Sequence, residues 1–108
     1  MSISPTYSPT APTRAEIEAL PGPTVIEFGN DWCGWCRRAQ ALISEAFAAS
    51  PNLRHLRIAD ARGNPLGRSF GVKLWPTLVF LRDGKEVAKL VRPGSAAEIA
   101  AALAAIAG

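Results

Sequence analysis

The spacing of apolar residues changes several times along the chain, and each spacing predicts one helix or strand. The run over residues 24–29 is almost entirely apolar and predicts a buried strand. Over residues 34–49 apolar positions recur every three or four residues, which predicts an amphipathic helix with one buried face. That face consists of Cys36, Ala39, Ile43 and Phe47. The apolar positions that predict a second strand are Leu53, Leu56 and Ile58.

The N-terminal residues 1–13 are rich in Ser, Thr and Pro and contain little that a core could bury. This composition predicts a flexible tail and assigns the folded domain to residues 14–108. The domain opens with a short helix, because Thr13 and Glu16 have the spacing of a capping box. This helix must stop at Pro21.

Turn-forming residues divide the second half of the chain. A stretch of them, followed by a short helical segment, separates the second strand from a hairpin. The hairpin strands are predicted at 77–82 and 86–91, with Asp83-Gly84 as their two-residue turn. A second capping box, which begins at Ser95, opens a final amphipathic helix.

This order of elements predicts one domain of the α/β class. Two strands separated by a helix form a parallel pair through a right-handed crossover, and the tight hairpin makes the last two strands antiparallel. The expected result is a mixed four-stranded sheet with helices on both faces. A fifth strand would have to come from the N-terminal tail, which contains no convincing one. With 108 residues, 48% of them hydrophobic, the chain can build a core without disulfide staples.

Charge and hydropathy exclude several kinds of function. The net charge is only +3, and the single basic doublet, Arg37-Arg38, is interpreted as a solvated helix face and not as a nucleic-acid surface. No run of about 18 apolar residues predicts a membrane span. The first residues lack the basic and apolar regions of a signal peptide. We therefore expect a cytoplasmic protein, and in that compartment a disulfide is usually catalytic or sensing.

Both cysteines of the chain lie in one five-residue segment, WCGWC at positions 32–36. A closed zinc site needs four ligands, usually Cys or His, and the rest of the chain offers only His55. We expect His55 to be a structural or surface residue and expect no metal site within one chain. A disulfide across so small a loop would stabilise the fold little. The motif therefore favours reversible thiol–disulfide chemistry.

The predicted position of this motif, between a strand and a helix, gives the two thiols different roles. Cys33 lies near the helix N-terminus, where free amide groups and the helix dipole favour a thiolate. Cys36 lies one turn deeper on the same face. We expect Cys33 to attack a substrate disulfide and Cys36 to resolve the mixed disulfide. No cofactor is expected beyond the Cys33–Cys36 couple itself, and Gly34 leaves room for the substrate to approach.

Trp-Cys-Gly-x-Cys after a buried strand resembles the motif of thioredoxin and the thioredoxin-like oxidoreductases. Trp75-Pro76-Thr77 is similar to the cis-proline loop of that family, and residues 70–72 are similar to its aromatic-Gly-aliphatic segment. The resemblance covers residues 14–107. It implies the thioredoxin fold, a cis Pro76 opposite the cysteines, and backbone beside it that pairs with a bound substrate strand. The partners it implies are disulfide-containing proteins and a thioredoxin reductase as electron donor, with the protein itself a monomer.

Glu27 lies six residues before Cys33, where thioredoxins place a buried acid. A carboxylate inside an apolar strand costs free energy unless it is neutral or paired. We therefore predict that its pKa is raised and that it takes a proton from Cys36 during resolution. The alternative is a strand-end Glu that faces solvent or pairs with an Arg.

The tryptophans of the motif and of the proline loop are predicted to surround the nucleophile as an apolar docking surface. The predicted substrate-binding residues are Trp32, Gly34, Trp35, Trp75, Pro76 and Thr77. The alternative for the tryptophans is core packing, which fits Trp35 least because it lies at a helix start.

The chain departs from the usual thioredoxin pattern at several positions. Trp35 replaces a proline, and Glu27 replaces an aspartate. The helix after the motif runs through Ala39-Gln40-Ala41 without the proline that thioredoxins carry in this helix, so no kink is expected. Arg92 occupies the loop in which thioredoxins present a glycine to the substrate, so its side chain would narrow or charge the contact surface. These departures indicate a partner set of its own.

Three functions stay open from the sequence. The first is a dithiol–disulfide oxidoreductase, which would reduce cytoplasmic targets or, if exported, would oxidise or isomerise disulfides. The second is a binding module without turnover, which docks a partner through the tryptophans and uses the cysteines as a redox sensor. The third is a zinc ion that bridges two chains through Cys33 and Cys36 of each.

Overall fold

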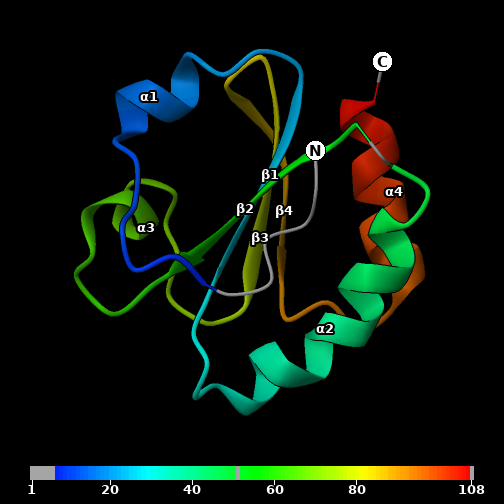
Figure 1. Cartoon of the computed structure of the whole chain (residues 1–108), viewed down its shortest axis with the longest axis horizontal. Helices are drawn as coiled ribbons and strands as arrows, with labels where there is room; N and C mark the ends of the chain where they lie inside the picture. The colour runs from blue at the N-terminus through cyan, green and yellow to red at the C-terminus, as the bar shows by residue number, and fades with distance from the viewer. Residues whose placement is uncertain (1–6, 51, 108) are drawn as a thin grey trace.

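The computed structural model describes residues 7–50 and 52–107, which fold into one α/β domain (Figure 1). Its elements in chain order are α1 (Arg14–Glu18), β1 (Pro23–Gly29), α2 (Gly34–Phe47), β2 (Arg54–Ala59), α3 (Pro65–Ser69), β3 (Thr77–Arg82), β4 (Lys85–Val91) and α4 (Ala96–Ile106). The predicted order of helices and strands is confirmed, with boundaries within two residues of those expected for the long elements.

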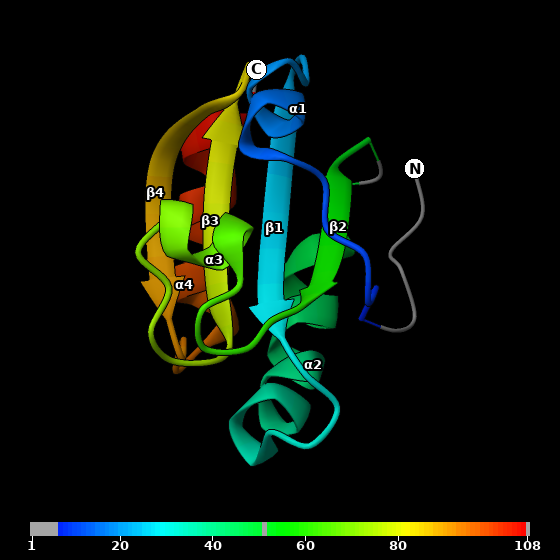
Figure 2. The same cartoon turned by 90° about the vertical axis from the view of Figure 1, so that its left-hand side faces the viewer.

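The four strands form one mixed sheet in the order β2-β1-β3-β4 (Figure 2). β1 pairs in parallel with β2 and antiparallel with β3, and β3 pairs antiparallel with β4. The predicted mixed four-stranded sheet is therefore confirmed. β1 is an interior strand of this sheet. The cysteine segment follows the C-terminal end of β1 and therefore begins at the middle of the sheet and not at its side.

Helices cover both faces of the sheet: α1 and α3 lie on one side, and α2 and α4 on the other (Figures 1 and 2). Successive side chains of β1 point to opposite faces. Val25 therefore packs into the apolar cluster under α2 and α4, and Ile26 packs into the cluster under α1 and α3. Because both faces are covered, the strand reads as a continuous apolar run and not as an alternating one.

The hairpin turn between β3 and β4 depends on its glycine. Asp83 and Gly84 have φ values of 52° and 80°, the left-handed conformation that a two-residue hairpin of this kind requires. A Cβ on Gly84 would also lie 2.1 Å from the backbone oxygen of Glu18, at the end of α1. The Asp-Gly turn predicted from the sequence is confirmed, and it also lets α1 pack against the hairpin.

The two predicted capping boxes differ in the structure. At α1, Thr13 accepts from the Glu16 amide, and the Glu16 side chain accepts from the Thr13 amide, so this box is complete. At α4, Ser95 accepts from the Glu98 amide at 3.2 Å, but the Glu98 carboxylate accepts from the Gly94 amide and not from Ser95. Both caps mark their helix starts correctly.

The expected flexible tail over residues 1–13 has to be revised for residues 7–13, while residues 1–6 lie outside the described part of the chain. Ser8 forms a parallel bridge with Ile58, with backbone hydrogen bonds of 2.8 Å on each side of it. Tyr7 is only 8% exposed. A single large aromatic residue thus anchors a segment whose composition is otherwise polar, and the fifth strand is reduced to one bridge beside β2.

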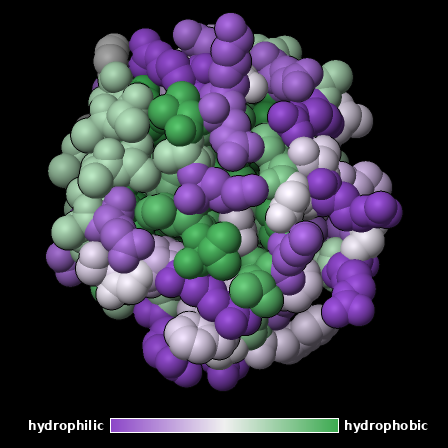
Figure 3. All heavy atoms as spheres, turned by 180° about the vertical axis from the view of Figure 1, so that it is seen from behind, coloured by the Kyte–Doolittle hydropathy of each residue, from purple (hydrophilic) through white to green (hydrophobic). Residues whose placement is uncertain are grey.

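The surface is mixed in polarity. Seen from behind, apolar side chains lie among hydrophilic ones, and the pale green area on the side of α4 corresponds to exposed alanines of that helix (Figure 3). In the part of the chain that the structure describes, no helix combines the length and apolarity that crossing a membrane requires.

Candidate active site

Cys33 lies where the loop after β1 enters α2. It is the N-cap residue of α2, and its Sγ accepts a hydrogen bond from the Cys36 amide at 3.1 Å. Its side chain is partly exposed, and a Cβ on the neighbouring Gly34 would meet no atom within 4 Å. The sulfur is therefore held by a helix-start amide and remains accessible from the open side.

Cys36 lies in a different environment. It is fully buried in the first turn of α2. Burial, together with the hydrogen bond and charge of Cys33, raises the pKa of the Cys36 thiol to about 12. The two thiols of the motif are thus one accessible sulfur at a helix N-terminus and one protected sulfur behind it.

The loop before β3 lies opposite Cys33, as the sequence predicts. The Trp75–Pro76 peptide bond is cis, and the Cys33 thiol donates to the Trp75 carbonyl at 3.5 Å. The Trp75 indole Nε1 donates to Oδ2 of the buried Asp60 at 2.9 Å, which fixes the orientation of the ring.

Thr77 does not lie on the predicted substrate-binding surface. Its side chain is buried, and its hydroxyl donates to the Leu74 carbonyl at 2.6 Å, closing the loop from inside. Pro76 is buried as well. The side chains that this loop presents to solvent are those of the half-buried Trp75 and of Leu74, which the sequence analysis did not single out.

The two tryptophans of the motif point outward and are not part of the core. Trp32 is 89% exposed and Trp35 is 47% exposed. The guanidinium groups of Arg38 and Arg92 each lie 4.8 Å from the ring centre of Trp35, at cation–π distance. Arg38 is exposed, as the predicted solvated helix face requires, and its guanidinium also contacts this ring.

Arg92 also contacts the proline loop. Its Nε donates to the Trp75 carbonyl at 2.9 Å, and its amide donates to the Pro76 carbonyl at 2.9 Å. Its φ of 49° is the left-handed conformation that favours glycine, which agrees with the glycine of the family pattern at this loop. The Arg92 guanidinium therefore lies between the proline loop and Trp35.

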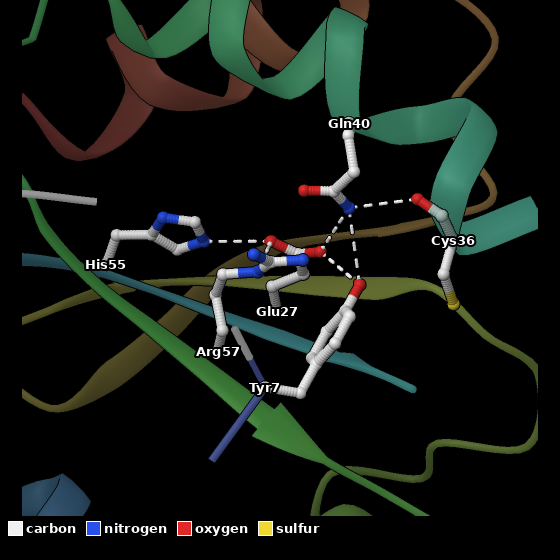
Figure 4. A network of polar contacts seen from close by, with 6 residues as sticks. All are labelled: Tyr7, Glu27, Cys36, Gln40, His55 and Arg57. Atoms are coloured by element: carbon white, nitrogen blue, oxygen red, sulfur yellow. Dashed lines mark hydrogen bonds and ion pairs between the residues drawn. The ribbon is translucent and has the colours of Figure 1, made fainter. Parts of the chain in front are cut away.

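Glu27 is fully buried and lies at the centre of a polar network (Figure 4). Its Oε1 is 2.9 Å from Nε2 of His55 and 3.2 Å from Nε of Arg57. Its Oε2 accepts from the Tyr7 hydroxyl and, at 2.9 Å, from Nε2 of Gln40. Both carboxylate oxygens thus have polar partners, which come from three separate segments of the chain: the N-terminal segment, α2 and β2.

The predicted raised pKa of Glu27 is wrong. Burial alone would raise it, but hydrogen bonds from His55, Tyr7 and Gln40 and the charge of Arg57 outweigh burial and lower it. The carboxylate is therefore held in its ionised form. His55, expected to be structural or at the surface, is buried and takes a structural part in this network.

Sequence reasoning named none of the four partners of Glu27, although its alternative of pairing with an Arg is met by Arg57. Arg57 could have been predicted, because parallel pairing of the two predicted strands places it directly opposite Glu27 in the sheet. Tyr7 is the only tyrosine of the chain, but nothing in its polar surroundings indicated burial. For Gln40 the only signal was the absence of the family's proline.

No metal-binding group stands out in this region. Within residues 7–50 and 52–107, no three His, Cys, Asp or Glu side chains are grouped so that they could hold a metal ion.

Comparison with known proteins gives consistent matches. The family model for thioredoxin matches residues 9–105. The structure of thioredoxin 2 from Pseudomonas aeruginosa PAO1 in its reduced form is 53% identical, covers 96% of both chains and superposes with a TM-score of 0.85, which confirms the predicted thioredoxin fold. A thioredoxin of Chlamydia muridarum is 34% identical over 65% of this chain and 69% of its own length. Thioredoxin Asp f 28 of Aspergillus fumigatus is 27% identical over 72% of each chain.

Proposed function

The chain belongs to the thioredoxin family and is a thiol–disulfide oxidoreductase, and from this premise we propose that Cys33 is its attacking thiol and Cys36 its resolving thiol. The observation that carries the assignment is the difference in their surroundings. Cys33 Sγ is accessible and held by the Cys36 amide, whereas Cys36 is buried. No observation on the described residues favours a docking module without turnover or a zinc-bridged pair of chains.

The reaction proceeds in two exchanges. The Cys33 thiolate attacks one sulfur of the substrate disulfide, and the other substrate sulfur leaves as a thiolate and takes up a proton. Cys36 then loses its proton, its sulfur bonds to that of Cys33, and the bond from Cys33 to the substrate breaks with its electron pair on the substrate sulfur. The substrate gains two electrons, and the Cys33–Cys36 pair becomes a disulfide. The pair itself serves as the redox group without a further cofactor.

We propose that substrate binds across Trp35, Trp75 and the backbone at Pro76. The Trp75 carbonyl already accepts from Arg92. A carbonyl oxygen has two lone pairs, and the second one accepts from the Cys33 thiol. It becomes free for a substrate amide when Cys33 ionises. Arg92 would therefore border the bound substrate.

The preferred partners are acidic around their disulfide. Two grooves flank the site, one of about 270 Å³ beside Trp35 and one of about 520 Å³ beside Trp75. Their basic lining residues are Arg38 and Arg92 in the first and Arg62, Arg68 and Lys73 in the second. No acidic residue of the described chain lines either groove. Charge of one sign on both sides attracts carboxylates and speeds their encounter with the site.

Arg92→Gln tests this preference. It removes the charge and retains a donor for the Trp75 carbonyl. We expect kcat/KM for a disulfide peptide with flanking acidic residues to fall about fivefold, the equivalent of about 1 kcal/mol for two charges about 4 Å apart in water. Reduction of a neutral peptide of the same length should stay unchanged. Lys85→Gln, at the far end of the sheet, removes the same charge and should affect neither peptide. Equal losses on both peptides would contradict the acidic preference.

We propose that the protein works as a reductase in the cytoplasm and takes electrons from a thioredoxin reductase. Both cysteines belong to the motif, as expected in a compartment where disulfides are mainly catalytic. A redox titration in defined dithiol buffers tests the proposal, with the fluorescence of Trp32 and Trp35 as the reporter. We expect one two-electron transition near the range of about −270 mV that is typical of thioredoxin. A transition near about −120 mV would instead indicate an oxidase, and the absence of a transition would remove the enzymatic function.

A further inference from the structure

Among the described residues, no hydrogen bond joins the buried carboxylate of Glu27 to either sulfur, but two of its donors also lie next to Cys36. Gln40 Nε2 donates to the Cys36 backbone carbonyl at 2.9 Å, which positions the helix turn but not the thiol. The Tyr7 hydroxyl lies near the thiol itself. A Cβ on Gly29 would lie 2.7 Å from the Tyr7 hydroxyl oxygen and 2.9 Å from Cys36 Sγ, so both atoms lie on the same side of this glycine and next to the same point of its backbone.

The surroundings of Tyr7 fix its ring and leave its hydroxyl between two acceptors. The Arg57 guanidinium lies 4.1 Å from the ring centre, and the backbone of Ser8 is held against β2 by two hydrogen bonds. The hydroxyl has one proton, and both Glu27 Oε2 and Cys36 Sγ can accept it. In the structure this proton is donated to Glu27 (Figure 4).

Glu27 can lose the hydrogen bond from Tyr7 at low cost in free energy. Its Oε2 keeps the hydrogen bond from Gln40, and its Oε1 keeps His55 and Arg57. A carboxylate that keeps two hydrogen bonds and an ion pair is still satisfied in the interior. Rotation of the Tyr7 hydroxyl toward sulfur therefore leaves no buried charge without a partner.

We propose that the Tyr7 hydroxyl turns its proton from Glu27 to Cys36 Sγ as this thiol ionises, and so stabilises the resolving thiolate. The inference rests on the proposed role of Cys36. In the resolving step the Cys36 proton passes to the departing substrate thiolate, directly or through solvent, and the Tyr7 proton remains on its own oxygen throughout. Glu27 stays ionised and acts through Tyr7, not as the base that the sequence suggested.

The electrostatics of the network agree with this role. Burial and the charge of Glu27 raise the pKa of the Tyr7 hydroxyl, so it remains a donor wherever thiol exchange operates. Burial is the largest influence on Cys36 and raises its pKa, and the nearby Tyr7 hydroxyl opposes burial by a smaller amount. Without the hydroxyl, burial would disfavour the thiolate more strongly.

Tyr7→Phe removes the hydroxyl and keeps the ring. The reduced protein is mixed with an aromatic disulfide that releases a coloured thiol at each exchange, so the first phase reports attack by Cys33 and the second phase reports resolution by Cys36. We expect the second phase to slow by between about tenfold and a hundredfold, as for the loss of a hydrogen bond to a charged group. The first phase should be unchanged. Its presence in the wild type, and its loss in Cys33→Ser, establishes the proposed function separately from the role of Tyr7.

A second modified protein distinguishes an effect of the Tyr7 hydroxyl on catalysis from an effect of the substitution on the fold. Tyr7 is the only tyrosine of the chain, so growth on 3-fluorotyrosine replaces this residue alone and makes its hydroxyl a stronger donor. We expect the pH profile of the second phase to shift to lower pH while the first phase keeps its profile. An unchanged second phase in both proteins would overturn the proposal, as would equal slowing of both phases in Tyr7→Phe with no shift for fluorotyrosine.

Discussion

Cys36→Ser accumulates a covalent complex with a disulfide-bonded protein, whereas Cys33→Ser forms none. The reason is the position of the two sulfurs. Cys33 is accessible at the start of α2, so it can attack a large substrate, and Cys36 is buried and reaches only Cys33. Both variants should lose essentially all turnover, because the reaction needs both sulfurs. The complex is detected as a band on a non-reducing gel that disappears on reduction, and mass spectrometry identifies the linked cysteine.

The double variant Cys33→Ser/Cys36→Ser serves as the control for non-covalent association. Complexes trapped in equal amounts by the two single variants would contradict the assignment of roles. Complexes trapped only by Cys33→Ser would reverse it.

Glu27→Gln lowers the free energy of unfolding at pH 7 by about 3–5 kcal/mol, the usual cost of removing one partner of a buried ion pair. The substitution leaves Arg57 charged and buried opposite a neutral group. It also places a second amide beside Gln40. If the NH2 group of this amide faces the Gln40 NH2 group, two donors meet, and if it faces the other way, Oε1 is no longer an acceptor for His55 and Arg57. Urea unfolding followed by fluorescence measures the change. Glu45→Gln, on the exposed side of α2, is the matched control and should change stability by less than about 0.5 kcal/mol.

The same network predicts how stability depends on pH. The pKa of Glu27 is lower in the folded than in the unfolded chain, where it is 4.5. Its contribution to stability is therefore present above about pH 4.5 and is lost as the pH falls through the folded-state value. The difference in unfolding free energy between wild type and Glu27→Gln should shrink on acidification in this range. A difference that is constant from pH 7 to pH 3 would show that the carboxylate is not held ionised.

Local signals were sufficient to predict the elements. The Thr13 capping box, the Asp83-Gly84 turn and the apolar face of α2 each act within a few residues, and each is found as expected. The cysteine pair and the cis-proline loop were likewise identified from short motifs. These features do not depend on how distant segments of the chain meet.

The features that could not be predicted from the sequence depend on contacts between distant segments of the chain. The pKa of Glu27 was predicted with the wrong sign because burial could be inferred from the strand, whereas donors from residues 7, 40, 55 and 57 could not all be foreseen. Thr77 was placed on the binding surface because its motif lies there. Only its hydrogen bond to the Leu74 carbonyl shows that its side chain faces inward.

The bridge between Ser8 and Ile58 has a consequence for the outer edge of the sheet. β2 is an edge strand, and an uncovered strand edge is a template on which a second molecule can add a strand. Ser8 occupies the backbone groups of Arg57 and Ala59 at this edge. Detachment of Tyr7 and Ser8 from β2 would therefore expose this strand edge and remove the Tyr7 ring from beside Cys36 in one event. Resistance to aggregation through β2 and the environment of the Cys36 thiol would thus both depend on the same short segment, whose composition is that of a disordered tail.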